Sequence, residues 1–307
     1  MDLSALEDAS FGVNRSWVMQ GCRLLCMCCL VFVFIAPNKA SDASRPERTS
    51  FDHTHAQWAD LLERAVYKDR DGSASKLDYQ IFADDSGTFA DYLKGLSDVS
   101  AAQFRGFSSA EQLAFLLNAY NAFMVAKVMM RYPKITSVWD FGRVFNSPFK
   151  HRFFELLGDR RSLDDIEHGL IRGDSLLMDP RIHFAVNCAS VGCPALRDEP
   201  FLSSQIDAQL EDQTIRFLKD RTRNYFDRGS RRLVVSPLFD WYSGDFEPPD
   251  NQSQDGVVGF LHHYRAALGL TFEEQKRLLE GRVKIGYSNY DWRLNDFGGG
   301  GALSDGQ

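Results

Sequence analysis

Residues 113–130, LAFLLNAYNAFMVAKVMM, are apolar on nearly every face of a helix. A surface helix keeps a polar face at a period of 3.6 residues, so a helix without one lies buried among other elements. Ser108 and Glu111 stand three residues apart just before this run, which is the pattern of a capping box. The sequence therefore predicts a buried central helix over residues 109–131.

Two asparagines interrupt the apolar helix. Asn118 and Asn121 are three residues apart and so share one of its faces. Buried amides have to find hydrogen-bond partners. These two either tie the helix to neighbouring loops or line a pocket, and the rule that buried polar groups are satisfied favours the first interpretation.

Shorter patterns along the chain predict the other elements, helices from apolar residues at helical spacing and strands from short apolar runs between turn residues. The expected helices are 51–66, 163–171, 204–219, 237–244 and 257–268, and one more that Thr271 and Glu274 begin and Gly281 closes. The expected strands are 182–188, 224–226, 232–235 and 283–287.

Helices outnumber strands in this pattern, and no regular alternation of strand and helix and no internal repeat occurs. That combination is typical of α+β folds rather than of parallel α/β sheets. We expect a single globular domain over residues 51–297, rich in helix, with a small mixed or antiparallel sheet around the buried central helix.

The segment 181-RIHFAVNCASVGCPALR-197 gathers the residue types that carry chemistry. As a strand, it places His183 and Asn187 on one face and Cys188 on the other. Cys193 follows a flexible turn that can return it to either face. A reacting pair of His183 and Cys193 is therefore the arrangement that the strand allows.

Pro194 directly follows Cys193 and favours the first position of a helix, which would put Cys193 at the N-cap. A helix N-terminus stabilises a thiolate and lowers the pKa of the thiol. A nearby histidine completes an activated nucleophile, and a carboxylate that orients the histidine completes a triad. We expect Cys193 to attack and His183 to act as the base.

Three aspartates are candidates for orienting His183: Asp291, Asp240 and Asp245. We prefer Asp291, because it lies in a polar and aromatic cluster that follows an expected strand. Donors to a developing oxyanion would come from Asn187 and from one of the asparagines of the central helix.

Other interpretations of the cysteines stay open. A disulfide between Cys188 and Cys193 is sterically allowed across a turn, and buried cysteines are also common as small apolar residues. A metal site of His183 with the two cysteines is weaker, because strand alternation disperses the ligands. His53 and His55 form a pair without a third ligand nearby. We therefore expect no metal and no cofactor.

The N-terminus carries a different pattern. Residues 24–36, LLCMCCLVFVFIA, form an apolar run of a length that suits the core of a signal peptide and is too short to span a membrane. We interpret residues 1–40 as a signal peptide, with Met19 as an alternative start and an uncleaved membrane anchor as the other interpretation. Residues 41–50 would be a linker, and the glycine-rich residues 298–307 a disordered tail.

This leader changes how the cysteines are counted. Four of the chain's six cysteines lie in it, so Cys188 and Cys193 alone would remain after cleavage. We expect an exported protein, periplasmic or secreted, or else one anchored by its N-terminal segment. An oxidising compartment favours a disulfide between two nearby cysteines.

Composition narrows the class of partner. The chain is 44% hydrophobic and 25% charged, which is typical of globular proteins, and its formal net charge is −7. Nucleic-acid-binding proteins usually carry a basic excess. The one basic segment, from Arg216 to Arg232, is interrupted by acidic residues, so we interpret it as solvated surface and expect no nucleic-acid partner.

Five motifs in this order resemble those of the bacterial domain-of-unknown-function family 547. They are 114-AFLLNAYNA-122, 162-SLDDIEHGLI-171, 179-DPRIHFAVNCASVGCPALR-197, 239-FDWYSGDF-246 and 290-YDWRLND-296. The resemblance covers residues 51–297 and implies no settled activity. A relationship to papain-like or transglutaminase-like thiol enzymes would make the cysteine and histidine of the third motif the reacting pair, although papain-like enzymes run cysteine first.

Our first hypothesis is a thiol-dependent hydrolase or transferase that acts on an amide, peptide or thioester-like bond of a small-molecule or peptide substrate. The alternative is a non-catalytic envelope protein that binds a ligand, with a structural Cys188–Cys193 disulfide. In either case a membrane is contacted only through an uncleaved leader. The expected binding residues are Asn118, Asn121, Asn187, Cys188, Asp240, Trp241 and Trp292.

Overall fold

The computed structural model describes residues 50–142, 147–247 and 256–298, which belong to one compact unit beginning at Ser50. The expected signal peptide or anchor over residues 1–40, the linker up to residue 49 and residues 299–307 of the expected tail lie outside the described residues. Within the described part of the chain, no helix is long and apolar enough to cross a membrane.

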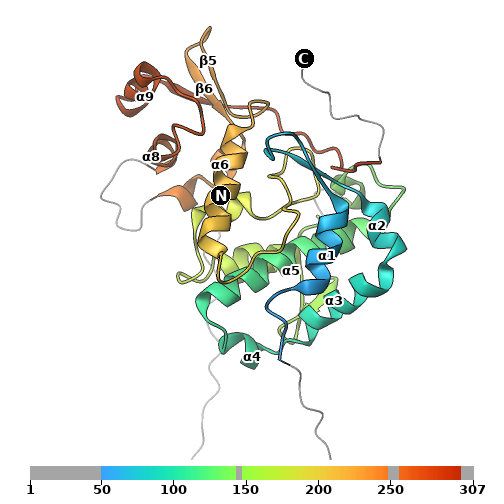
Figure 1. Cartoon of the computed structure of the whole chain (residues 1–307). Coiled ribbons are helices and arrows are strands. Elements are labelled where there is room, and N and C mark those ends of the chain that lie inside the picture. The colour runs from blue at the N-terminus through green and yellow to red at the C-terminus, as the bar shows by residue number, and fades with distance from the viewer. Residues whose placement is uncertain (1–49, 143–146, 248–255, 299–307) are drawn as a thin grey trace, which may run out of the picture. The chain divides into compact units, whose positions relative to one another are not determined.

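Helix α5 (Ser109–Met129) runs through the middle of this unit (Figure 1). Every residue from Leu113 to Val125 is buried, as the apolar pattern predicts. The Ser108 hydroxyl accepts the backbone N–H of Glu111, and the Glu111 carboxylate accepts that of Ser108 at 2.8 Å. The expected central helix and its capping box are confirmed, because both depend on local sequence alone.

The N-terminal helices pack beside α5 (Figure 1). Helix α1 begins later than expected, at Ala56, because the Asp52 carboxylate accepts the N–H groups of Thr54 and Ala56 and holds residues 52–55 in a turn. Residues 79–105, for which the sequence analysis made no prediction, form helices. The bounds are α1 (Ala56–Ala65), α2 (Tyr79–Asp84), α3 (Ser86–Asp98) and α4 (Ala101–Arg105).

The described strands form small sheets. Hairpins β1 (Val66–Lys68) with β2 (Ser75–Leu77) and β3 (Phe154–Leu156) with β4 (Asp159–Arg161) are antiparallel. In the third sheet, β6 (Arg232–Val235) pairs antiparallel with β5 (Tyr225–Asp227) and parallel with β7 (Lys284–Tyr287). The fold is therefore α+β, rich in helix, with small sheets around a buried helix, as expected.

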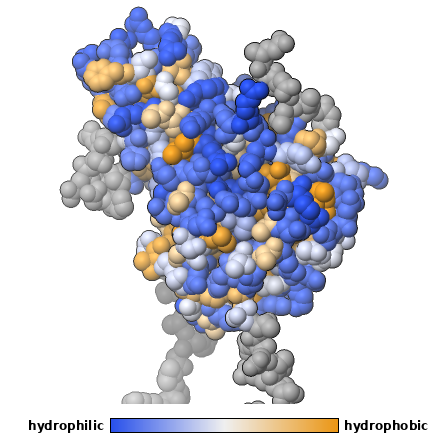
Figure 2. Space-filling view, in the orientation of Figure 1, coloured by the Kyte–Doolittle hydropathy of each residue, from blue (hydrophilic) through white to orange (hydrophobic). Residues whose placement is uncertain are grey.

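The apolar residues form two clusters. The larger one surrounds α5, and the second lies between α6 (Ile206–Lys219), α8 (Gly256–His263) and α9 (Phe272–Leu279). The short helices α7 (Leu238–Trp241) and η4 (Ser243–Phe246) contribute Phe239 and Phe246 to this second cluster. On the face shown in Figure 2, hydrophilic residues prevail and apolar residues form separate small areas.

Residues 182–188 are not a strand. The chain forms the 3₁₀ helix η3 (Pro180–Phe184) there, because Asp179 caps it by accepting the N–H of Arg181 at 2.8 Å and Pro180 occupies its first position. No regular element follows Pro194 either, so Cys193 is not at a helix N-cap. Both arguments from regular geometry at this motif were wrong, and its residues must be located by their contacts.

Candidate functional site

A cavity of about 320 Å³ lies where the five motifs meet. Its walls include Tyr120 of α5, residues around the π-helical segment η2 (Asp165–Ile171), both cysteines and the segment after β7. The lining residues that carry polar or aromatic groups include Tyr120, Asp164, Glu167, His168, His183, Cys188, Cys193, Trp241, Tyr242, Tyr290 and Trp292. Segments far apart in sequence thus share one site.

His183 is buried in the wall of this cavity, with its side chain 0% exposed. Its Nε2 lies 2.7 Å from Oδ2 of Asp245, which η4 carries. Arg172 also donates to both carboxylate oxygens of Asp245, at 2.5 and 2.8 Å. Burial raises the pKa of Asp245, but hydrogen bonds from His183 and Arg172 outweigh it and hold that pKa well below its usual range.

This contact fixes the tautomer of His183. An ionised carboxylate only accepts hydrogen bonds, so the hydrogen of a neutral imidazole must be on Nε2 and the lone pair on Nδ1. Nδ1 lies 3.8 Å from Oε1 of Glu167, too far for a hydrogen bond. Among the residues that the structure describes, neither of these two buried atoms has a hydrogen-bond partner.

The carboxylate of Glu167 is held by two tyrosines. The hydroxyls of Tyr120 and Tyr242 are hydrogen-bonded to it. Burial, and next the negative charge of Glu167, raise the pKa of both tyrosines well above 10, so both remain donors. The Tyr242 ring also stacks on His183, with 3.8 Å between ring centroids. Glu167 and His183 are therefore held close together by the same neighbour.

The other candidate carboxylates lie elsewhere. Asp291, the preferred partner of His183, instead accepts from the exposed guanidinium of Arg293 at 3.0 Å. Asp240 is hydrogen-bonded to Tyr287. The residue that orients His183 is Asp245, which corrects the preference for Asp291. The polar and aromatic cluster around Asp291 misled here, because no pattern along the chain shows that η4 brings Asp245 to His183.

Cys188 and Cys193 form a disulfide, with their Cα atoms 6.0 Å apart. Both residues line the cavity. The sulfur of Cys193 lies 2.9 Å from the backbone nitrogen of Cys188 and 3.3 Å from the hydroxyls of Ser190 and Tyr290. Burial raises the pKa of Tyr290 to about 12, so its hydroxyl is a donor at neutral pH. The Cys193 sulfur therefore has two hydrogen-bond donors, the Cys188 N–H and the Tyr290 hydroxyl, with the Ser190 hydroxyl beside it.

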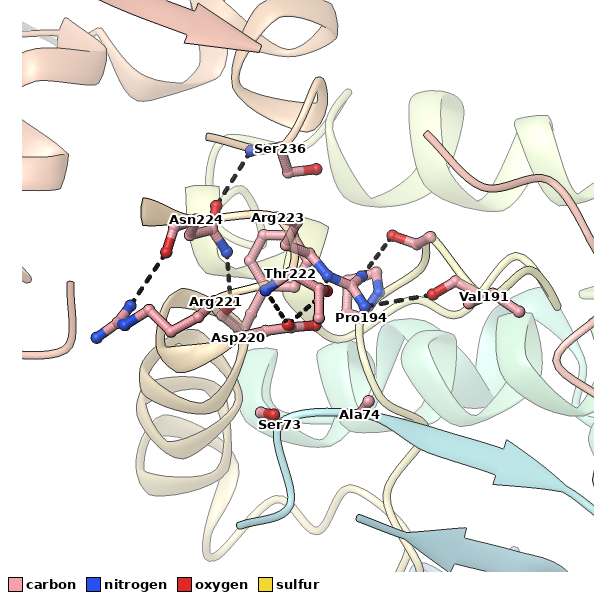
Figure 3. Close-up of polar contacts among 12 residues, drawn as sticks. Ser73, Ala74, Val191, Pro194, Asp220, Arg221, Thr222, Arg223, Asn224 and Ser236 are labelled. Carbon is pink, nitrogen blue, oxygen red and sulfur yellow. Dashed lines mark hydrogen bonds and ion pairs between the residues drawn. The ribbon is translucent and has the colours of Figure 1, made fainter. Parts of the chain in front are cut away.

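Arg223 holds the loop that carries the disulfide. Its guanidinium donates to the carbonyls of Gly192 at 2.6 Å and Cys193 at 2.8 Å, and it pairs with Asp220. It also donates to the carbonyl of Val191 at 3.3 Å (Figure 3). The residue is only 8% exposed. The interpretation of the basic segment as solvated surface was therefore wrong for Arg223, which caps a buried loop instead.

The three asparagines serve the structure. Asn118 bonds the backbone N–H and carbonyl of Phe201 at 3.0 and 2.8 Å. Asn121 donates to the carbonyl of Ala185 and accepts the N–H of Asn187 at 2.8 Å. The Asn187 amide donates to the carbonyl of Pro194 at 2.7 Å. None of the three lines the cavity, so they tie α5 to the cysteine motif rather than supply oxyanion donors.

Aromatic rings form one wall of the cavity. Trp292 stacks on Trp241 at 5.8 Å between ring centroids, and it contacts Tyr290 at 4.4 Å and Trp139 at 4.9 Å. The expected binding residues Trp241 and Trp292 therefore both lie at the site, and Trp241 is 47% exposed. Within the described ranges, no group of three or more His, Cys, Asp or Glu side chains is placed to hold a metal ion.

Part of the chain matches the model of a protein family. The model of the family "Protein of unknown function, DUF547" matches residues 104–218. Residues 104–218 are therefore similar to this family. The matched stretch contains α5, Glu167, His183 and both cysteines, and it confirms the resemblance over those residues. No curated protein and no solved structure matches the chain.

The site extends beyond the stretch that matches the DUF547 family. Asp245, Tyr242, Trp241, Tyr290 and Trp292 all lie after residue 218. Glu167 was not predicted as a site residue, and neither were Tyr120 and Tyr242, although each lies inside one of the five motifs. The position of a carboxylate on the apolar side of the segment 163–171 could have indicated Glu167. No feature of the sequence indicates which residues contact it.

Proposed function

We propose that the domain is a hydrolase or acyltransferase that acts on an amide, peptide or thioester-like bond of a substrate bound in the cavity. The observation that carries this proposal is His183, which is bonded to Asp245 through Nε2 and has an unpaired Nδ1 in the cavity wall. A histidine oriented by a carboxylate on one nitrogen and free on the other is the arrangement of a general base.

Asp245 has two effects in this proposal. It fixes the ring of His183 with Nδ1 free, and its charge stabilises the imidazolium that forms when Nδ1 takes a proton. The bidentate contact from Arg172 keeps Asp245 ionised and immobile. The base His183 and its orienting group Asp245 thus come from two segments of the chain, and Arg172 from a third segment holds Asp245 in position.

Cys193 is the nucleophile when the disulfide is reduced, for which an external dithiol supplies two electrons and two protons. The Cys188 N–H and the Tyr290 hydroxyl, which donate to its sulfur, then stabilise the thiolate in place of the expected helix N-terminus. His183 takes the proton of the Cys193 thiol at Nδ1, the thiolate attacks the substrate carbonyl, and a C–S bond forms. The bond between the carbonyl carbon and the leaving group then breaks, and the leaving group takes the proton from His183. Water or another acceptor, deprotonated by His183, then breaks the C–S bond and restores the thiolate.

The test needs no known substrate. Reduced protein is alkylated with iodoacetamide at a series of pH values, as wild type and as Cys188→Ser and Cys193→Ser. We expect one thiol that reacts at neutral pH with an apparent pKa well below about 8.5, lost only in Cys193→Ser. Hydrolysis of p-nitrophenyl acetate and of an acyl thioester is then followed in Asp245→Asn and in Asp291→Asn, the matched control.

Asp245→Asn should lower turnover of these probes at least about tenfold, whereas Asp291→Asn should leave it unchanged. Full turnover by Cys193→Ser would show that the thiol is not the nucleophile. Equal effects of the two aspartate substitutions would show that the bond between Asp245 and His183 has no catalytic role.

A second candidate is a non-catalytic ligand-binding protein. The closed disulfide and the aromatic wall around Trp241 and Trp292 favour it. The disulfide would then be a clamp, and the intact protein would weigh less than its reduced form by two hydrogen atoms. Ligand binding that survives Cys193→Ser, with no turnover after reduction, would support this candidate against the first.

We also propose that the protein works outside the cytoplasm. The apolar run of residues 24–36 supports this location, and a closed disulfide is stable in an oxidising compartment. Fractionation of cells that express the full chain tests it, because recovery in the cytoplasm with free thiols would contradict the proposal.

A further inference from the structure

The unpaired atoms of Glu167 and His183 point to the chemistry of the ligand. Oε1 of Glu167 and Nδ1 of His183 are 3.8 Å apart, on side chains that are 7% and 0% exposed. Both residues line the cavity, and among the described residues neither atom has a partner. Buried polar atoms without partners cost stability, so an atom from outside the protein is needed to satisfy them.

Both atoms are hydrogen-bond acceptors. The Glu167 carboxylate has no hydrogen to give, and it already receives the hydroxyls of Tyr120 and Tyr242. In the neutral imidazole whose Nε2 hydrogen goes to Asp245, Nδ1 of His183 is an acceptor. One group that satisfies both atoms must therefore bring two hydrogens on a single atom. A hydroxyl brings one, and a carboxylate or phosphate brings repulsion.

The charged and aromatic side chains around Glu167 and His183 narrow the class of ligand further. The charged side chains among the described lining residues are the carboxylates of Asp164 and Glu167 and the ammonium of Lys150, so the wall carries an excess of negative charge. Asp164 already faces His168 at 3.6 Å, so Glu167 is the buried carboxylate in which one oxygen, Oε1, lacks a hydrogen-bond partner among the described residues. Aromatic faces such as those of Trp241 and Tyr290 attract cations, and they also cover apolar surface.

We propose that the cavity binds a substrate through a primary amino group, which lies between Glu167 and His183, with an apolar or aromatic remainder against the tryptophan wall. Water also has two hydrogens, but it carries no charge and leaves the aromatic wall uncovered. The inference rests on the proposed function in one respect, that this cavity is the substrate site. Binding itself requires neither a free thiol nor turnover.

The experiment compares three probes of similar size on the oxidised protein by calorimetry: 2-phenylethylamine, 2-phenylethanol and 3-phenylpropanoate. We expect the amine to bind at least about tenfold more tightly than the alcohol, because a hydrogen bond to a charged group is stronger than a neutral one. The carboxylate should bind most weakly. Equal affinities, a preference for the alcohol or no binding of the amine would overturn the proposal.

Two variants locate the effect. Glu167→Gln keeps the side-chain shape and removes the charge, so it should weaken amine binding by about 10- to 100-fold and leave alcohol binding nearly unchanged. Asp164→Asn, in the same cavity but with its side chain 32% exposed, should change amine binding by less than about fivefold. An equal loss in both variants would mean that general charge, not the pair of acceptors, attracts the amine.

Failure of this inference is distinguishable from failure of the proposed function. Amine-selective binding without turnover of any ester or thioester after reduction would refute the enzyme and leave the amine site standing. Turnover that depends on Cys193 and Asp245, without any preference for the amine, would do the opposite.

Discussion

Two buried histidines, His55 and His183, differ in ways that burial does not predict. They are 2% and 1% exposed, and each has one nitrogen 2.7 Å from an oxygen. The oxygen is the hydroxyl of Tyr92 for His55 and the carboxylate of Asp245 for His183. Burial lowers the pKa of His55 to about 4, although Asp52 opposes it, so His55 is neutral at physiological pH.

The role of a buried histidine therefore depends on the charge of its hydrogen-bond partner and on what surrounds its second ring nitrogen. His55 lies at the start of α1, packs against Phe51 at 5.3 Å between ring centroids and does not line the cavity of His183. His183 has an anionic partner that supports a positive charge, and its free nitrogen lies in the cavity wall. His55 thus has a neutral partner away from this cavity, whereas His183 has an anionic partner and is the base in our proposal.

The largest expected effect separates the two histidines by activity. His183→Asn should lower turnover of the acyl probes by about 100-fold or more, the usual contribution of a general base. His55→Asn should leave turnover unchanged, and asparagine tolerates the positive φ of 51° at this position. Steady-state kinetics on the reduced variants check this. Similar losses of turnover in both variants would mean that the two histidines do not differ in function.

The next effect concerns pH. Because the pKa of His55 is about 4 in the fold and 6.5 in the unfolded chain, the unfolded state binds the proton first as the solution is acidified. The stability that neutral His55 contributes is complete above 6.5 and is lost as the pH falls toward 4, by about 3 kcal/mol at most. Urea unfolding at several pH values measures it. His55→Asn should show a correspondingly smaller loss, and an unchanged slope would mean that other groups cause it.

The smallest expected effect concerns Tyr92, the neutral hydrogen-bond partner of His55. Tyr92→Phe removes the hydroxyl that faces Nδ1 of His55 and should cost about 1 kcal/mol of stability, the usual value for one hydrogen bond. Alkylation of Cys193 should stay as in wild type. A change in the reactivity of that thiol would link the two histidines in a way that their separate surroundings do not suggest.

The sequence by itself determined the features that depend on neighbouring residues. The central helix followed from apolar residues on all of its faces and from the capping box of Ser108 and Glu111. The α+β class and the strands β5 and β6 followed from equally local patterns. The motifs that line the cavity were recognised as motifs for the same reason, since each is a short run of residues.

Local reasoning failed at residues 182–188. The short apolar run there suggested a strand, but the Asp179 cap and Pro180 start a 3₁₀ helix that extends to Phe184. The same failure removed the helix expected after Pro194. A short run of residues is compatible with several backbone shapes, and here the tertiary contacts of Asn121 and Arg223 select one.

Only the tertiary structure decided how the site is assembled. It joined Cys188 to Cys193, where the sequence left the disulfide and the free thiol open. It brought Asp245 to His183 across 62 residues and left the nearby acceptor of Glu167 unpaired. Such contacts depend on the packing of whole elements against α5, and no spacing along the chain records that packing.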